Sequence, residues 1–133
     1  MLIEINTLDQ SPIYEQLRDQ IVLGIAGKKL APGETLPSVR RLAADLGINF
    51  HTVNKAYAML YDEGYIVMDR RKGAMVSEAV KKDDTFISRH TNKLAITAAE
   101  AICHNTSLNE FITLCRECYR KARGNPKEGA NNG

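Results

Sequence analysis

Residues 36–76 constrain the fold of this chain more than any other stretch of its 133 residues. Two amphipathic segments, about 38–46 and 50–63, are separated by Gly47, a residue type that adopts the left-handed backbone conformation at little cost. Residues 65–77 then place two hydrophobic segments on either side of a polar tip that contains glycine, which is typical of a β-hairpin. Two helices across a tight turn followed by a hairpin predict a winged helix-turn-helix.

The two helices of this motif carry clear start signals. Ser38 and Asn49 directly precede them, and both residue types accept hydrogen bonds from the first turn of a helix. In the second helix, apolar residues recur at helical spacing and are expected to face the core: Val53, Ala56, Tyr57 and Leu60. The residues left on the outward face are His51, Thr52, Asn54, Lys55 and Ala58.

Ahead of the motif, the sequence predicts one more helix, about 12–28, with apolar residues at helical spacing. Ser11 is the expected N-cap and Pro12 the expected first-turn residue. Residues 2–5 are expected to add a short edge strand, and residues 30–34 are expected to form a turn around a Pro-Gly pair.

Two further amphipathic helices, about 83–104 and 108–123, are expected after a polar break at residues 81–84. Ser107 and Glu110 have the spacing of a capping box at the start of the second. The predicted fold is therefore mainly α with a small β-hairpin. It comprises a winged helix-turn-helix domain at 1–78, a two-helix module at 79–123 and a disordered C-terminus at 124–133.

The charge of the chain is modest, with a formal net value of +2. Residues 1–78 carry nine basic and ten acidic side chains, a net charge of −1, whereas the remainder carries nine and six, a net charge of +3. Overall basicity therefore indicates no particular partner. The basic residues are clustered instead, with Arg40, Arg41 and Lys55 in the helical pair and 70–72 at the hairpin tip.

No apolar run approaches the roughly 20 residues of a membrane span, and the N-terminus lacks the features of a secretory signal. Three cysteines form an odd count, which fits a reducing compartment better than a disulfide framework. We expect a cytoplasmic protein that does not associate with membranes.

Five separated landmarks carry a resemblance to a known family. They are Ser11-Pro-Ile-Tyr-Glu-Gln-Leu, Pro32-Gly-Glu-Thr-Leu-Pro-Ser-Val-Arg, Leu42-Ala-Ala-Asp-Leu-Gly, Thr52-Val-Asn-Lys-Ala-Tyr and Glu63-Gly-Tyr-Ile. Together they resemble the N-terminal domain of GntR-family transcriptional regulators over residues 11–78, and the short two-helix tail resembles the YtrA subfamily. The resemblance implies a transcription regulator that acts as a repressor and has double-stranded DNA as its partner.

A helix-turn-helix presents the first residues of its second helix to base edges in the major groove. The residues expected to bind DNA are Ser38, Arg40, Phe50, His51, Thr52, Asn54, Lys55, Arg70, Arg71, Lys72 and Gly73. Asn54 suits adenine, Arg40 suits guanine or phosphate, and Lys55 suits a phosphate. The resemblance implies the DNA contact of Arg40, whose position in the family is occupied by a DNA-binding arginine.

Two parts of the expected site depart from the usual pattern of the family. Relatives commonly have proline and asparagine where this chain has Phe50 and His51, and Arg71-Lys72 replaces the first glycine region of the hairpin tip. Phe50 has two interpretations, contact with a thymine methyl group or simple cover for the turn. The tip at 70–73 is expected to enter the minor groove, where the negative potential attracts arginine.

The two tail helices carry more apolar surface than they can bury against each other, so we expect a homodimer. The expected dimerisation residues are Leu94, Ala98, Ile102, Leu108, Phe111, Ile112, Cys115 and Tyr119. The alternative function is a metal- or redox-responsive switch that uses Cys103, Cys115 and Cys118, although buried apolar cysteines are the preferred interpretation. No metal site, cofactor or small-molecule effector is indicated, and no catalytic constellation is present in the sequence.

Overall fold

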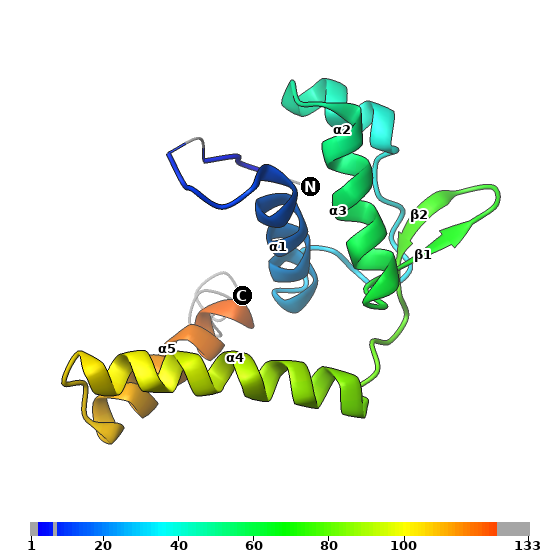
Figure 1. The fold of residues 1–133 in the computed structure, drawn as a ribbon. Helices are drawn as coiled ribbons and strands as arrows, with labels where there is room; N and C mark the ends of the chain where they lie inside the picture. The colour runs from blue at the N-terminus through cyan, green and yellow to red at the C-terminus, as the bar shows by residue number, and fades with distance from the viewer. Residues whose placement is uncertain (1–2, 7, 125–133) are drawn as a thin grey trace, which may run out of the picture. The chain divides into compact units, whose positions relative to one another are not determined.

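The computed structural model describes residues 3–6 and 8–124 (Figure 1). Two compact units make up the chain, one extending to Val80 and the other beginning at Lys81. The elements in chain order are α1 (Ile13–Ala26), α2 (Val39–Leu46), α3 (Phe50–Asp62), β1 (Ile66–Asp69), β2 (Gly73–Val76), α4 (Asp84–Cys103) and α5 (Leu108–Ala122). The chain is thus mainly α-helical with a two-stranded antiparallel hairpin, as the sequence predicts.

The first unit is a three-helix cluster with a hairpin, in which α3 packs against both α1 and α2 (Figure 1). Its core combines the inner face of each helix, two leucines of the α1–α2 connection and the inward residues of the hairpin: Leu17, Ile21, Leu30, Leu36, Leu42, Ala43, Val53, Ala56, Tyr57, Leu60, Ile66, Ala74 and Val76. The inward positions expected for α3 are all buried. Burial on both sides of α3 fixes which of its faces is turned toward solvent.

The helix-turn-helix is formed by the predicted caps. The Ser38 hydroxyl accepts a hydrogen bond from the Arg41 amide at 3.1 Å, and the Asn49 side chain accepts one from the His51 amide at 2.7 Å. Between them, Gly47 ends α2 with a φ of 66°. A left-handed residue at this point turns the chain sharply enough for α3 to start three residues later.

The predicted cap of α1 is wrong. The N-cap is Pro12, which has no side chain able to accept a hydrogen bond, and the helix begins at Ile13. Hydrogen bonds from the Ser11 backbone and hydroxyl to Asp9 lower the pKa of that carboxyl, so the Ser11 hydroxyl is already engaged. The Ser11 carbonyl in turn accepts the Gln16 side-chain amide at 3.0 Å, which holds a turn in front of the helix.

The hairpin pairs with a third extended segment in addition to its own two strands. β1 and β2 pair antiparallel from Ile66 opposite Val76 to Asp69 opposite Gly73. Residues 33–36 run along the other edge of β2, where the Gly33 amide donates to the Val76 carbonyl and the Leu36 amide donates to the Ala74 carbonyl, each at 2.8 Å. The sequence prediction of a turn before α2 missed this third pairing, which anchors the hairpin to the α1–α2 connection.

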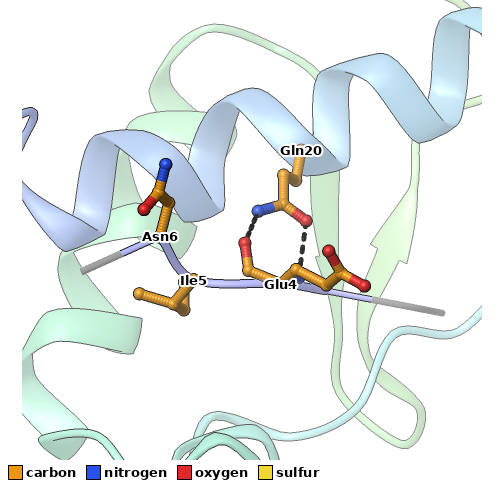
Figure 2. Close-up of a pocket in the computed structure, with 4 residues that line it drawn as sticks. All are labelled: Glu4, Ile5, Asn6 and Gln20. Carbon is orange, nitrogen blue, oxygen red and sulfur yellow. Dashed lines mark hydrogen bonds between the residues drawn. The ribbon is translucent and has the colours of Figure 1, made fainter. Parts of the chain in front are cut away.

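The predicted edge strand at the N-terminus is wrong for residues 3–5, which are extended but belong to no strand. Two glutamines of α1 hold this segment instead. Gln20 accepts a hydrogen bond from the Glu4 amide at 2.9 Å and donates one to the Glu4 carbonyl (Figure 2), and Gln16 accepts one from the Asn6 amide at 2.9 Å. The Gln20 side chain thus satisfies both the amide and the carbonyl of Glu4, so this backbone needs no hydrogen bonds from a neighbouring strand.

The second unit consists of α4 and α5. Asp83 caps α4 by accepting from the Phe86 amide at 2.8 Å, and Ser107 and Glu110 form the predicted capping box of α5. Neither helix contains a buried residue. Cys103, Cys115 and Cys118 are exposed within a single chain, so the expected burial of the cysteines is not met there. The expectation of disorder for the C-terminus falls, apart from Gly124, outside the described residues.

Candidate DNA-binding surface

The solvent face of α3 begins with a run of polar side chains. His51, Asn54 and Lys55 are exposed and Thr52 is half-buried. Val53 and Ala56, which alternate with them along the helix, are buried. Alternation of this kind fixes the rotation of α3 about its axis. The residues expected to meet base edges are therefore together on one exposed helix face.

A cationic and aromatic cluster joins α2 to the start of α3. The Arg40 guanidinium carbon lies 5.9 Å from the centroid of the Phe50 ring. The Phe50 and His51 rings meet edge to face, with centroids 5.6 Å apart and planes at 83°. Arg40 on α2 and Phe50 at the start of α3 therefore belong to one continuous surface across the turn.

Arg41 differs from its neighbour Arg40. Its Nε lies 3.3 Å from a carboxylate oxygen of Asp45, one turn further along α2. Both side chains of this pair are exposed, so the interaction contributes little to stability. It does give the Arg41 guanidinium a local partner, which fits its omission from the expected DNA contacts.

Lys55 has an aromatic partner on another helix. Its Nζ lies 4.0 Å from the centroid of the Tyr14 ring, in the first turn of α1. An ammonium group over a tyrosine face is attracted by the ring quadrupole. The contact places the Lys55 charge at the boundary between α3 and the start of α1, on the exposed side of both.

The hairpin tip is organised by Asp69, a residue that the sequence analysis did not select. Its carboxylate accepts hydrogen bonds from the backbone amides of Lys72 at 2.9 Å and Arg71 at 2.8 Å. These hydrogen bonds lower the pKa of the Asp69 carboxyl. Gly73 follows with a φ of 78°. An aspartate that precedes a basic tip is a recognisable turn signal, because its side chain mimics a backbone carbonyl.

The three basic side chains of the tip, Arg70, Arg71 and Lys72, are all exposed. With the turn held by Asp69, they project from a fixed backbone. The predicted site residues thus form two exposed groups in the first unit, one on the helix-turn-helix and one on the hairpin tip.

Two partly buried interactions hold α3 and its C-cap residue in place behind this surface. The Arg18 guanidinium of α1 forms a two-pronged contact with Glu63, with N–O distances of 2.9 and 3.0 Å. Burial alone would lower the pKa of Arg18, but the hydrogen bonds and charges of Glu63 and Asp19 raise it above its ordinary value. The Tyr57 hydroxyl donates to the Pro37 carbonyl at 2.7 Å, which ties α3 to the segment before α2.

Neither a metal cluster nor a membrane span is found in the described part of the chain. No group of three His, Cys, Asp or Glu side chains within residues 3–6 and 8–124 is arranged to hold a metal ion. Over the same residues, no helix combines the length and apolar character needed to cross a bilayer. Nothing in this region supports the alternative of a metal- or redox-responsive switch on Cys103, Cys115 and Cys118.

The fold and the exposed face of α3 define the protein as a winged helix-turn-helix of the type that binds DNA. The family model described as "Bacterial regulatory proteins, gntR family" matches residues 10–76. The chain belongs to the GntR family of bacterial regulatory proteins, and it is a transcription regulator rather than an enzyme.

Similarity to individual relatives extends beyond the family domain. The chain is 35% identical over 116 residues to the HTH-type transcriptional repressor YtrA of Bacillus subtilis, covering 84% of this chain and 89% of the relative. YtrA from Sulfolobus acidocaldarius, a GntR-family transcription factor, is 40% identical with a TM-score of 0.62, over 76% of this chain and 99% of that one.

A crystal structure of a transcriptional antiterminator from Listeria monocytogenes aligns with a TM-score of 0.87 and 28% identity. The alignment covers 93% of this chain and 94% of that one. Similarity over the second unit as well as the first supports a YtrA-type architecture, in which a short helical tail follows the winged domain.

Proposed function

We propose that the protein is a cytoplasmic repressor that binds a two-fold symmetric operator as a homodimer. The observation that carries the proposal is the exposed polar face at the start of α3, which lies next to Arg40 and is held there by buried contacts on the other side of the helix. Short polar side chains at the N-terminal end of a recognition helix are the groups that read base edges in the major groove.

The surface divides by chemistry into base-reading and phosphate-binding groups. Asn54 and Thr52 read bases, because an amide pairs with adenine and a threonine offers both a hydroxyl and a methyl group. Arg40 and His51 donate to guanine or to phosphate. Lys55, a compact charge at the edge of α3, binds a phosphate, as do the backbone amides at the helix starts marked by Ser38 and Asn49.

The hairpin tip supplies the second contact. Arg70, Arg71 and Lys72 are exposed on a turn fixed by Asp69. Gly73, which has a positive φ, carries no side chain at the end of the tip. In the proposed complex this tip enters the minor groove beside the major-groove site, where a narrow groove concentrates negative potential.

Dimerisation is proposed through the second unit. Several of the selected apolar side chains are largely exposed in a single chain, with exposed fractions of 59% for Leu94, 73% for Ile102 and 71% for Leu108. The others of the proposed set are Ala98, Phe111, Ile112, Cys115 and Tyr119. Because an apolar stripe of this size is normally covered, a second copy that presents the same stripe is the natural partner.

Repression is supported by the similarity to YtrA of Bacillus subtilis, an HTH-type transcriptional repressor. A dimer bound at its operator acts on transcription by occupying that site, so its effect depends on where the operator lies. No feature of the described residues indicates an effector.

The proposal is tested by selecting bound duplexes from a random-sequence pool. We expect the selected sequences to share two inverted half-sites whose centres lie about 10 base pairs apart. Binding to them should weaken steeply as salt rises, because lysine and arginine displace counterions from phosphates. Enrichment of no sequence would contradict sequence-specific regulation, and a single asymmetric site would contradict the homodimer.

A further inference from the structure

Phe50 is an exposed aromatic residue at the first position of α3, with an exposed fraction of 41%. It lies outside the hydrophobic core. The turn between α2 and α3 is covered from within by Leu46 and Ile48, which pack against that core. Phe50 is therefore not needed to close the turn, which was one of its two interpretations.

The position of Phe50 is nevertheless defined by its neighbours. The Arg40 guanidinium carbon lies 5.9 Å from the ring centroid, and the His51 ring meets the ring edge to face. An aromatic face beneath a guanidinium restrains the arginine side chain while leaving its donors directed outward. Arg40 and Phe50 thus present a hydrogen-bond donor and an apolar ring side by side.

These two surfaces match two adjacent base pairs. An arginine fork pairs with O6 and N7 of guanine, and an apolar side chain contacts the 5-methyl group of thymine. Successive bases along one strand are separated by about 3.4 Å. The 5.9 Å between the two groups is shorter than two such steps, so the two groups can reach neighbouring base pairs.

We propose that Phe50 is a specificity-determining residue that contacts the 5-methyl group of a thymine next to the guanine bound by Arg40. The inference rests on the proposed function and specifies its ligand further. Each operator half-site then contains a thymine and a guanine in adjacent base pairs, and the His51 ring packs edge to face against the Phe50 ring.

Deoxyuridine scanning of the selected duplex tests this contact, because uracil differs from thymine only by the missing methyl group. Each thymine of one half-site is replaced in turn, and binding is measured by fluorescence anisotropy. We expect one replacement to weaken binding of the wild-type protein about fourfold, which corresponds to the ~0.8 kcal/mol of one buried methyl group. That thymine should adjoin the base pair whose preference is relaxed by Arg40→Ala.

The variant Phe50→Ala should bind the thymine and uracil duplexes equally well. Tyr61→Ala is the matched control, since Tyr61 is also an exposed aromatic residue of α3 but lies near its C-terminal end; it should keep the fourfold difference. Circular dichroism verifies that both variants fold.

The inference would be overturned if no thymine of the half-site responded to replacement, or if the response persisted in Phe50→Ala. A responsive thymine that is distant from the Arg40 base pair would also overturn it, because the two groups form one surface. If the random pool yielded no preferred duplex, the proposed function itself would fail, and this inference with it.

Discussion

Arg40 and Arg41 are adjacent residues with the same charge and different surroundings, which makes them a matched pair for mutagenesis. The Arg40 guanidinium lies over the Phe50 ring at the start of the recognition helix, whereas the Arg41 guanidinium pairs with Asp45. We expect Arg40→Ala to cost about 1–3 kcal/mol of operator binding and to relax the preference at one base pair. Arg41→Ala should change operator binding much less.

Binding titrations on the selected operator and on its single-base variants provide the measurement. Unchanged affinity in Arg40→Ala would remove this residue from the surface. An equal loss for Arg40→Ala and Arg41→Ala would show that general positive charge, and not the position beside Phe50, determines binding.

The exposure of the site residues was predictable from sequence, but their contacts with each other were not. Helical spacing alone placed Val53 inward and Asn54 outward. The contacts of Arg40 with Phe50 and of Lys55 with Tyr14 depend on side-chain rotamers and on the packing of α1, which residue spacing does not encode.

Tyr57 gives the stability of the first unit a specific dependence on pH. Burial raises the pKa of its phenol, whose hydroxyl donates to the Pro37 carbonyl. In the unfolded chain the phenol ionises near its ordinary pKa of about 10. Above that pH the unfolded state binds fewer protons than the folded state, so the contribution of Tyr57 to stability is complete below about pH 10 and declines above it.

We expect Tyr57→Phe to cost about 0.5–1.5 kcal/mol near neutral pH, because the hydrogen bond to Pro37 is lost. The difference from wild type should shrink as pH rises above about 10, by up to about 1.4 kcal/mol per pH unit. Urea unfolding over this range measures it, and the exposed Tyr61 in Tyr61→Phe serves as control. A difference that stayed constant with pH would contradict an elevated pKa for Tyr57.

At the scale of elements, the conformation of the hairpin tip depends on a single acidic side chain, that of Asp69. Asp69 joins the end of β1 to the backbone of the basic tip, and its lowered pKa means that the carboxylate is ionised in the folded state well below neutral pH. Its stabilising contribution is present above the unfolded pKa and is lost as the pH falls through the folded value.

We expect Asp69→Ala to weaken binding to all DNA sequences similarly, because it loosens the tip without touching the recognition helix. Asp69→Asn should lie between alanine and wild type, since the amide oxygen still accepts from the backbone. Thermal unfolding should change little, because the carboxylate is fully exposed. A loss confined to one operator position would instead assign the wing a base-reading role.

Helices were more predictable than the segments that join them. Caps and periodicity located α2, α3 and α5, because these signals are local in sequence. The pairing of residues 33–36 with β2 and the attachment of residues 3–6 to α1 were not predictable, since both depend on partners distant in sequence. Ser11 failed as a cap for a different, local reason, because its hydroxyl is engaged by Asp9.

At the scale of the whole molecule, the two units have contrasting cores. The first has a well-buried core that includes Leu17, Val53 and Leu60, whereas no residue of α4 or α5 is buried. A helical pair with no fully buried residue gains little stability from packing. Its ordered state is therefore expected to depend on association, and the same association would place two recognition helices on one operator.

Ile112 and Thr113 test this dependence, because they are adjacent on α5 but point to different sides of the helix. Ile112 belongs to the apolar stripe, and Thr113 is turned about 100° away from it. We expect the wild-type protein to sediment at twice the 14.8 kDa chain mass. Ile112→Glu should sediment as a monomer and lose operator binding, since each half-site is then bound separately, whereas Thr113→Glu should remain dimeric. A wild-type protein that was monomeric at tens of micromolar would exclude the dimer. An Ile112→Glu variant that stayed dimeric would place the dimer contact elsewhere.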